Sequence, residues 1–186
     1  MKKILLVLLL ILSASAGQSH AGSQPSPSQQ CRKADALYAS GKFSKALLAY
    51  QEILSVPSGK VSKGEIFSRI ADCHFRLNDY QNALKSYESA LKNQKPSEQA
   101  PTQYWIGFCS LLLGRHAEAE KEFLKIPERY PKSGMWVGTA YYWAGRAAER
   151  LGEKDRAAGH YRKAGDKGNT TQGKFAMKKA EAVKGK

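Results

Sequence analysis

The stretch AYYWAGRAAERLGEKDRAAGHYRKA, residues 140–164, decides the fold. It contains small and aromatic residues at fixed distances around one turn glycine: Gly145, Gly152, Ala157, Tyr161 and Ala164. Residues four and seven positions apart lie on one face of an α-helix, so the last three share a face. The turn glycine ends one helix and lets the chain reverse. The stretch therefore predicts two antiparallel helices joined by a tight turn.

The same pattern occurs in three more places along the chain. The four turn positions are Gly41, Asn78, Gly114 and Gly152, at spacings of 37, 36 and 38 residues. Three other positions keep the same register: a small residue seven before each turn, an alanine five after it and an aromatic nine after it. In the earlier copies these are Ala34, Ala71 and Gly107; Ala46, Ala83 and Ala119; and Tyr50, Tyr87 and Phe123. Repeats of this length are typical of a solenoid, whose units are stable only when stacked.

The pattern resembles the tetratricopeptide repeat (TPR) family over roughly residues 28–166. The resemblance implies an all-α fold, a TPR-type α-solenoid of four helix-turn-helix repeats plus a C-terminal capping helix. We expect the repeats over residues 31–166 and a basic capping helix and tail over 167–186, with Phe175 packed on the fourth repeat. Residues 22–30 have no apolar side chain to bury and are predicted to form a flexible leader.

In TPR proteins the first helix of each repeat (helix A) lines a concave groove. The resemblance assigns ten side chains to this groove: Asp35, Tyr38, Asp72, Phe75, Arg76, Tyr104, Phe108, Tyr142, Arg146 and Glu149. The groove is expected to be aromatic at its centre and charged at its ends. Tyr104 and Phe108 are the leading anchors for a partner, because aromatic side chains often anchor interfaces. The alternative is that some of the ten are buried under a neighbouring repeat.

One TPR ligand class is disfavoured by the first repeat. TPR domains with a carboxylate clamp, which bind chaperone C-termini, have lysine and asparagine where this chain has Cys31 and Asp35. Cys73 and Cys109 occupy equivalent positions in successive repeats and are expected to be packed thiols, too far apart to form a disulfide. For Cys31, near the first helix start, a free thiol and a disulfide between chains both stay open.

The N-terminus has the three parts of a secretory signal peptide. Lys2 and Lys3 precede the apolar run Ile4–Leu12, and small residues follow it. Nine apolar residues are too few to span a membrane as a helix. No cysteine directly follows the run, so a lipidated cysteine is not expected. We therefore predict a cleaved signal peptide over residues 1–21 and a periplasmic or secreted protein.

The chain is strongly basic, and its last residues carry much of the excess. The formal net charge is +14, and residues 160–186 contain eight lysines and arginines against two acidic residues. A basic end can attract an anionic cell-wall polymer or membrane surface. The alternative is a solvated, lysine-rich helix. No nucleic-acid partner is expected, because no aromatic or glycine-rich nucleic-acid motif accompanies the lysines.

The sequence contains no pattern that indicates catalysis. The four histidines lack the spacing of a metal site, and we find no nucleophile elbow, phosphate-binding loop or zinc-protease motif. We predict that the protein is not an enzyme and has no metal and no cofactor. Its expected function is that of an exported TPR scaffold, or adaptor, for a protein or peptide in the bacterial cell envelope. Residues 129–133 and 140–145 resemble the periplasmic TPR subfamily.

The alternative function is an accessory module for cell-wall enzymes, with a basic surface for peptidoglycan. Residues 142–147 are similar to the helical repeats that precede the catalytic domain of lytic transglycosylases. No such catalytic domain follows them here, so activity of this chain alone is not expected. The sequence does not distinguish the two functions.

Overall fold

The computed structural model describes residues 25–56, 61–167 and 171–184, and within these ranges the chain is all-α. The helices are α1 (Pro27–Ala39), α2 (Phe43–Ser55), α3 (Lys63–Arg76), α4 (Tyr80–Asn93), α5 (Gln99–Leu112), α6 (His116–Arg129), α7 (Met135–Arg150), α8 (Lys154–Lys167) and α9 (Thr171–Lys184). A short 3₁₀ helix, η1 (Pro96–Glu98), precedes α5. The predicted signal peptide, residues 1–21, lies outside the described residues.

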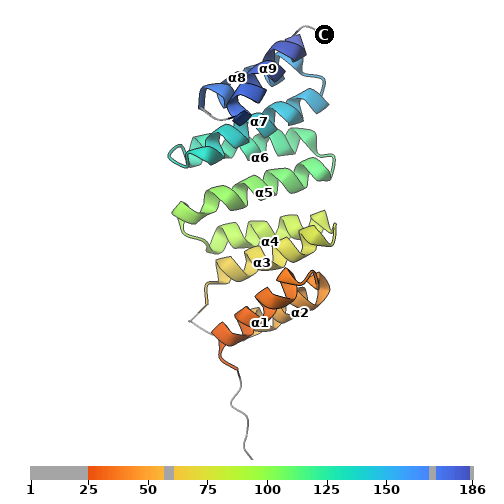
Figure 1. Cartoon of the computed structure of the whole chain (residues 1–186), viewed down its shortest axis with the longest axis vertical. Coiled ribbons are helices and arrows are strands. Elements are labelled where there is room, and N and C mark those ends of the chain that lie inside the picture. The colour runs from red at the N-terminus through yellow and green to blue at the C-terminus, as the bar shows by residue number, and fades with distance from the viewer. Residues whose placement is uncertain (1–24, 57–60, 168–170, 185–186) are drawn as a thin grey trace, which may run out of the picture.

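The helices stack along the long axis of the molecule in chain order (Figure 1). Each of them packs against the next helix in the sequence, and α5 also contacts α7. Helices α1, α3, α5 and α7 are the A helices of four repeats, and α2, α4, α6 and α8 are the B helices. The predicted fold class, an all-α solenoid of helix-turn-helix repeats, is confirmed.

The four turn residues adopt the left-handed backbone that the sequence requires. Gly41, Gly114 and Gly152 have φ of 74°, 74° and 78°, and Asn78 has φ of 60°. An added Cβ would have nothing within 4 Å at any of the three glycines, so glycine is favoured there by backbone conformation and not by space. Asparagine is one of the few other residues that tolerate this conformation.

The small residue before each turn serves a different purpose, because it allows helices A and B to approach closely. A Cβ on Gly107 would come within 2.9 Å of the Phe123 ring, and a Cβ on Gly145 within 2.7 Å of the Tyr161 ring. In the third and fourth repeats the aromatic residue of helix B therefore lies directly on the small residue of helix A. Tyr50, the corresponding aromatic of the first repeat, is 1% exposed.

The first helix begins earlier than the sequence indicated, so the end of the predicted leader 22–30 is wrong. Helix α1 starts at Pro27, and Ser26 caps it. The Ser26 hydroxyl accepts a bond from the Gln29 backbone amide, and the Gln29 side chain accepts one from the Ser26 amide. This capping box, with proline in the first turn, satisfies amides that a helix start leaves free. Polar capping residues start this helix, and the pattern of apolar residues does not reveal them.

Helix α9 packs on α8 as an A helix packs on the preceding B helix. In α7 the residues Val137, Ala140, Ala144 and Ala147 are buried in one core cluster with residues of α6. In α9 the buried residues Gly173, Ala176, Ala180 and Val183 have the same spacing of three, four and three positions. Helix α9 therefore occupies the place of a fifth A helix.

Phe175 packs on the fourth repeat, as predicted, but it is only partly covered. Its side chain is 52% exposed, although its ring centroid lies 6.0 Å from that of Tyr142. The alanines of α9 face α8 instead, because small side chains let the two helices approach closely. No helix in the described part of the chain is long and apolar enough to cross a membrane.

Candidate functional site: the face of the A helices

Tyrosine–acid pairs occupy the A-helix face in the first two repeats. The Tyr50 hydroxyl donates a hydrogen bond to Asp35 Oδ1 at 2.5 Å, and the Tyr87 hydroxyl donates one to Asp72 Oδ1 at 2.6 Å. In both pairs the acid is six residues before the turn and the tyrosine is nine after it. Each pair joins helix A to helix B, so these two carboxylates hold the repeat together.

The electrostatics of this half are set by burial and by arginines. Burial raises the pKa of Asp72, and this effect outweighs the Tyr87 hydrogen bond and the nearby charges of Arg69 and Arg76, which lower the pKa. Burial and the neighbouring carboxylates also raise the pKa of Tyr50 and Tyr87, so both hydroxyls stay protonated donors. Arg69 Nε is 3.8 Å from the carboxylate of Asp35.

The second arginine of this region is held by aromatic residues. Arg76 Nε donates a hydrogen bond to the Tyr38 hydroxyl at 3.2 Å, and its guanidinium lies 5.9 Å from the centroid of the Phe43 ring. Arg76 itself is exposed. Two of the predicted groove residues, Tyr38 and Arg76, are thus brought together across the first and second repeats.

The third repeat replaces the polar pair with aromatic side chains. Phe108 and Phe123 stand where the first two repeats have the acid and the tyrosine. Phe108 and the half-buried rings near it form what we call the aromatic cluster. Its members are Phe75, Tyr104, Trp105, Phe108, Trp136 and Trp143. Successive ring centroids in it are 4.8 to 6.1 Å apart, within the range of favourable aromatic contacts.

The predicted anchors Tyr104 and Phe108 lie at the centre of this cluster. Their rings stack with centroids 5.8 Å apart, and Phe108 meets Trp143 edge-on at 4.8 Å. The sequence analysis did not select Trp105, Trp136 or Trp143. Trp105 and Trp143 directly follow the predicted groove residues Tyr104 and Tyr142, and all three tryptophans of the chain lie within residues 105–143, a signal that could have identified them.

The fourth repeat joins its A helix to both α8 and α9. The Tyr161 hydroxyl donates to Glu149 Oε2 at 2.7 Å, and Lys179 Nζ donates to the same carboxylate at 2.9 Å. Burial alone would raise the pKa of Glu149, but bonds from Lys179 and Tyr161 and the charges of Lys179 and Arg146 lower it. Tyr142 is buried, with 9% of its surface exposed, so one predicted groove residue is largely covered.

A pocket opens between the A helices of the third and fourth repeats, and we name it the α5/α7 pocket. Its volume is about 400 Å³. Its wall includes Phe108, Leu111, Leu112, Trp143, Arg146 and Arg150. The Arg146 guanidinium lies 6.0 Å from the Trp143 ring centroid and 3.9 Å from Glu149. Apolar side chains and two arginines thus meet in one recess.

The described residues contain no group of three or more histidine, cysteine or acidic side chains that could hold a metal ion. The three cysteines are free, and burial raises the pKa of Cys73 to about 11 and that of Cys109 to about 12. These two are packed thiols, as expected. Burial and neighbouring carboxylates also raise the pKa of Cys31, which makes its thiol less reactive.

The stacked helix pairs, the left-handed turns and the small-residue contacts define the class of the protein, an α-solenoid of helix-turn-helix repeats. The family model for the tetratricopeptide repeat matches residues 31–98, 68–134 and 137–169. The chain therefore belongs to the tetratricopeptide repeat family. Domains of this family are generally binding modules and not catalysts. A comparison with curated proteins found no match.

Solved structures share the fold at low sequence identity. RapI in its apo form superposes with a TM-score of 0.75 and 16% identity, over 86% of this chain and 49% of RapI. MamA from Desulfovibrio magneticus RS-1 gives 0.64 and 16%, over 87% and 95% of the two chains. The first TPR of Spaghetti (RPAP3), bound to the HSP90 peptide SRMEEVD, gives 0.54 and 15%, over 67% and 94%. The chain thus spans about half the length of RapI.

Proposed function

We propose that the protein is a scaffold that binds a peptide or protein segment along the face of its A helices. The observation that carries this proposal is the aromatic cluster, whose half-buried rings end at the α5/α7 pocket. Half-buried aromatic rings beside arginines are the usual composition of a binding hot spot. The TPR domain of RPAP3, a structural neighbour, is bound to a peptide, which supports the same type of ligand here.

We also propose that this binding takes place in the bacterial cell envelope. The support is the charged, apolar and small-residue order of residues 1–21, which is typical of a secretory signal peptide. Cell fractionation and the intact mass of the recovered protein test the location. We expect a periplasmic or secreted protein that lacks about the first 21 residues. A full-length protein in the cytoplasm would contradict the proposal.

Site-specific photo-cross-linking in intact cells tests the binding face. A photoreactive amino acid at Phe108 is expected to capture a defined partner, and the same amino acid at Leu48, which is 60% exposed on α2, is expected to capture none. The Tyr104→Ala/Phe108→Ala variant should lose most of the captured partner while keeping its helical circular dichroism. Equal capture from both positions, or undiminished capture by a folded double variant, would overturn the groove as the binding site.

The second candidate function is an accessory role for cell-wall enzymes. It is favoured by the basic C-terminal region, where Arg162, Lys163, Lys174 and Lys178 are exposed. Sedimentation with purified peptidoglycan sacculi tests it. Binding that weakens with salt would support this function, because screening acts on contacts between exposed charges. The absence of salt-sensitive binding would remove it.

A further inference from the structure

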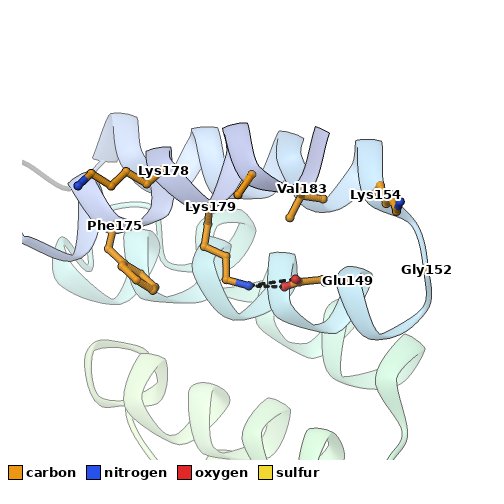
Figure 2. A pocket seen from close by; sticks show the side chains of 8 residues that line it. Glu149, Gly152, Lys154, Phe175, Lys178, Lys179 and Val183 are labelled. Carbon is orange, nitrogen blue, oxygen red and sulfur yellow. Dashed lines mark hydrogen bonds and ion pairs between the residues drawn. The ribbon is translucent and has the colours of Figure 1, made fainter. Parts of the chain in front are cut away.

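Helix α9 creates a second pocket, which is the counterpart of the α5/α7 pocket one repeat further along. This α7/α9 pocket has a volume of about 360 Å³ and is lined by Glu149, Lys154, Phe175, Lys178, Ala182 and Val183 (Figure 2). The turn glycine of the preceding repeat lines each pocket, Gly114 in the first and Gly152 in the second. Both pockets thus lie between successive A-type helices, at the same register of the solenoid.

Each pocket combines an apolar wall with cationic side chains. In the α7/α9 pocket, Phe175 and Val183 provide apolar surface between Lys178 at one end and Lys154 at the other (Figure 2). Lys179 Nζ forms an ion pair with Glu149 Oε2 at 2.9 Å. Among the described residues, no carboxylate lies within the 4.0 Å of an ion pair from Lys154 or Lys178. The one acid of the pocket is therefore already paired, and two lysines are available to a ligand.

We propose that the α7/α9 pocket binds an apolar side chain of an acidic peptide segment, whose carboxylates pair with Lys154 and Lys178. The same segment would continue into the α5/α7 pocket, where Arg146 and Arg150 lie beside Trp143. The inference rests on the proposed function, because it takes the ligand of the A-helix face to be a peptide. Helix α9 is then part of the binding site as well as the cap of the solenoid.

The geometry also limits the spacing of the two apolar anchors in the ligand. Packed helices lie about 8–10 Å apart, and an extended chain advances about 3.3 Å per residue. Pockets between successive A helices therefore suit apolar residues about three positions apart in an extended ligand. An acidic segment fits better than a neutral one, because exposed cations attract and orient anionic partners.

Fluorescence anisotropy with the purified full chain tests the proposal. The probe is a fluorescein-labelled peptide with two leucines three residues apart and glutamates on either side of each. Matched peptides replace the leucines with serine or the glutamates with glutamine. We expect saturable binding of the first peptide and binding at least about tenfold weaker for either matched peptide. Equal binding of all three peptides, or none, would overturn the proposal.

Variants of the chain locate the binding to the pocket. The Lys154→Glu/Lys178→Glu variant should bind the acidic peptide about tenfold more weakly, because two attractive charges become repulsive. The matched control, Lys45→Glu/Lys121→Glu, changes the net charge equally at two exposed lysines outside the pocket and should bind as the wild type does. Ala182→Trp, on an exposed face of α9, should weaken binding by filling the pocket without altering charge.

The outcomes separate this inference from the proposed function. If both double charge variants bind equally and Ala182→Trp has no effect, the α7/α9 pocket is not a binding site. Loss of capture by Tyr104→Ala/Phe108→Ala in cells would then still support the A-helix face. Vesicles of phosphatidylglycerol provide a further arm. Vesicle binding that exceeds peptide binding and is lost in Lys154→Glu/Lys178→Glu would overturn the peptide as the ligand.

Discussion

The first two repeats and the third use the same register positions for opposite chemistry. Asp35 and Asp72 pair with tyrosines of their B helices, whereas Phe108 occupies the same position in the third repeat beside a buried phenylalanine. Both arrangements join helix A to helix B. In the first two repeats the carboxylate of helix A is already hydrogen-bonded to a tyrosine of helix B. In the third repeat half-buried aromatic rings remain at the surface. The comparison teaches that one repeat position can stabilise the fold or prepare a surface for binding.

The largest expected effect comes from removing the buried ring of the third repeat. Phe123 is 0% exposed, so Phe123→Ala should destabilise the protein by about 3–5 kcal/mol through lost burial and a residual cavity. Tyr87→Phe in the second repeat keeps the ring and removes one hydrogen bond, at a cost of about 1 kcal/mol. Urea unfolding of both variants measures the difference. Similar losses in the two would contradict the view that aromatic packing holds the third repeat.

A tyrosine–acid pair should be able to replace the two phenylalanines of the third repeat. Phe123→Tyr alone buries a hydroxyl without an acceptor and should cost about 1–3 kcal/mol. Adding Phe108→Asp places an acid in the register of Asp72 and should recover part of that loss. A double-mutant cycle in urea unfolding gives the coupling between the two residues. The double variant should also lose the partner captured at the aromatic cluster. Simple additivity of the two changes would show that the tyrosine–acid pair does not form there.

Glycines should divide into two groups by the space around them. Gly107→Ala and Gly145→Ala place a methyl group against Phe123 and Tyr161, and we expect each to cost about 1–3 kcal/mol through overpacking. Gly159, inside helix α8, has nothing within 4 Å of an added Cβ. Gly159→Ala should therefore stabilise the protein by about 0.5–1 kcal/mol. Thermal melting of the three variants checks the opposite signs, and a stabilising Gly145→Ala would contradict the proposed close contact.

The smallest effect is a difference in pH dependence between the second and fourth repeats. The pKa of Asp72 is raised in the folded state, so ionising its carboxylate costs stability as pH rises above its ordinary range. Asp72→Asn, whose amide oxygen can still accept from Tyr87, should leave the protein as stable as the wild type or more stable at neutral pH. This difference should disappear once the solution is acidic enough to protonate the carboxylate in both states.

The contribution of Glu149 to stability depends on pH with the opposite sign. Its pKa is lowered in the folded state, so its stabilising effect is present above its ordinary range and lost as pH falls through the folded value. Glu149→Gln should cost about 1 kcal/mol at neutral pH, through weaker bonds with Tyr161 and Lys179. The cost should vanish in acid. Unfolding measured at several pH values compares the two variants, and shifts of the same sign would refute the distinction.

The sequence predicted the fold class and assigned ten side chains to the A helices, but it did not predict how far each side chain is buried. Tyr104 and Phe108 lie in the half-buried cluster, as the register suggested. Tyr142 has the same position in the fourth repeat as Tyr104 has in the third, but it is buried beside Tyr161 and Phe175. The register identifies which face of helix A a residue occupies. It does not say what the next helix places over that face.

The sequence by itself determined the repeats, because each turn requires a left-handed residue and each A–B contact requires a small residue opposite an aromatic one. These are constraints within about thirty-five neighbouring residues and leave a visible period. Only the tertiary structure decided that Lys179 binds Glu149 and that α9 serves as a fifth A helix with a pocket beside it. Such contacts join separate repeats, and they depend on side-chain directions in three dimensions that spacing along the chain does not specify.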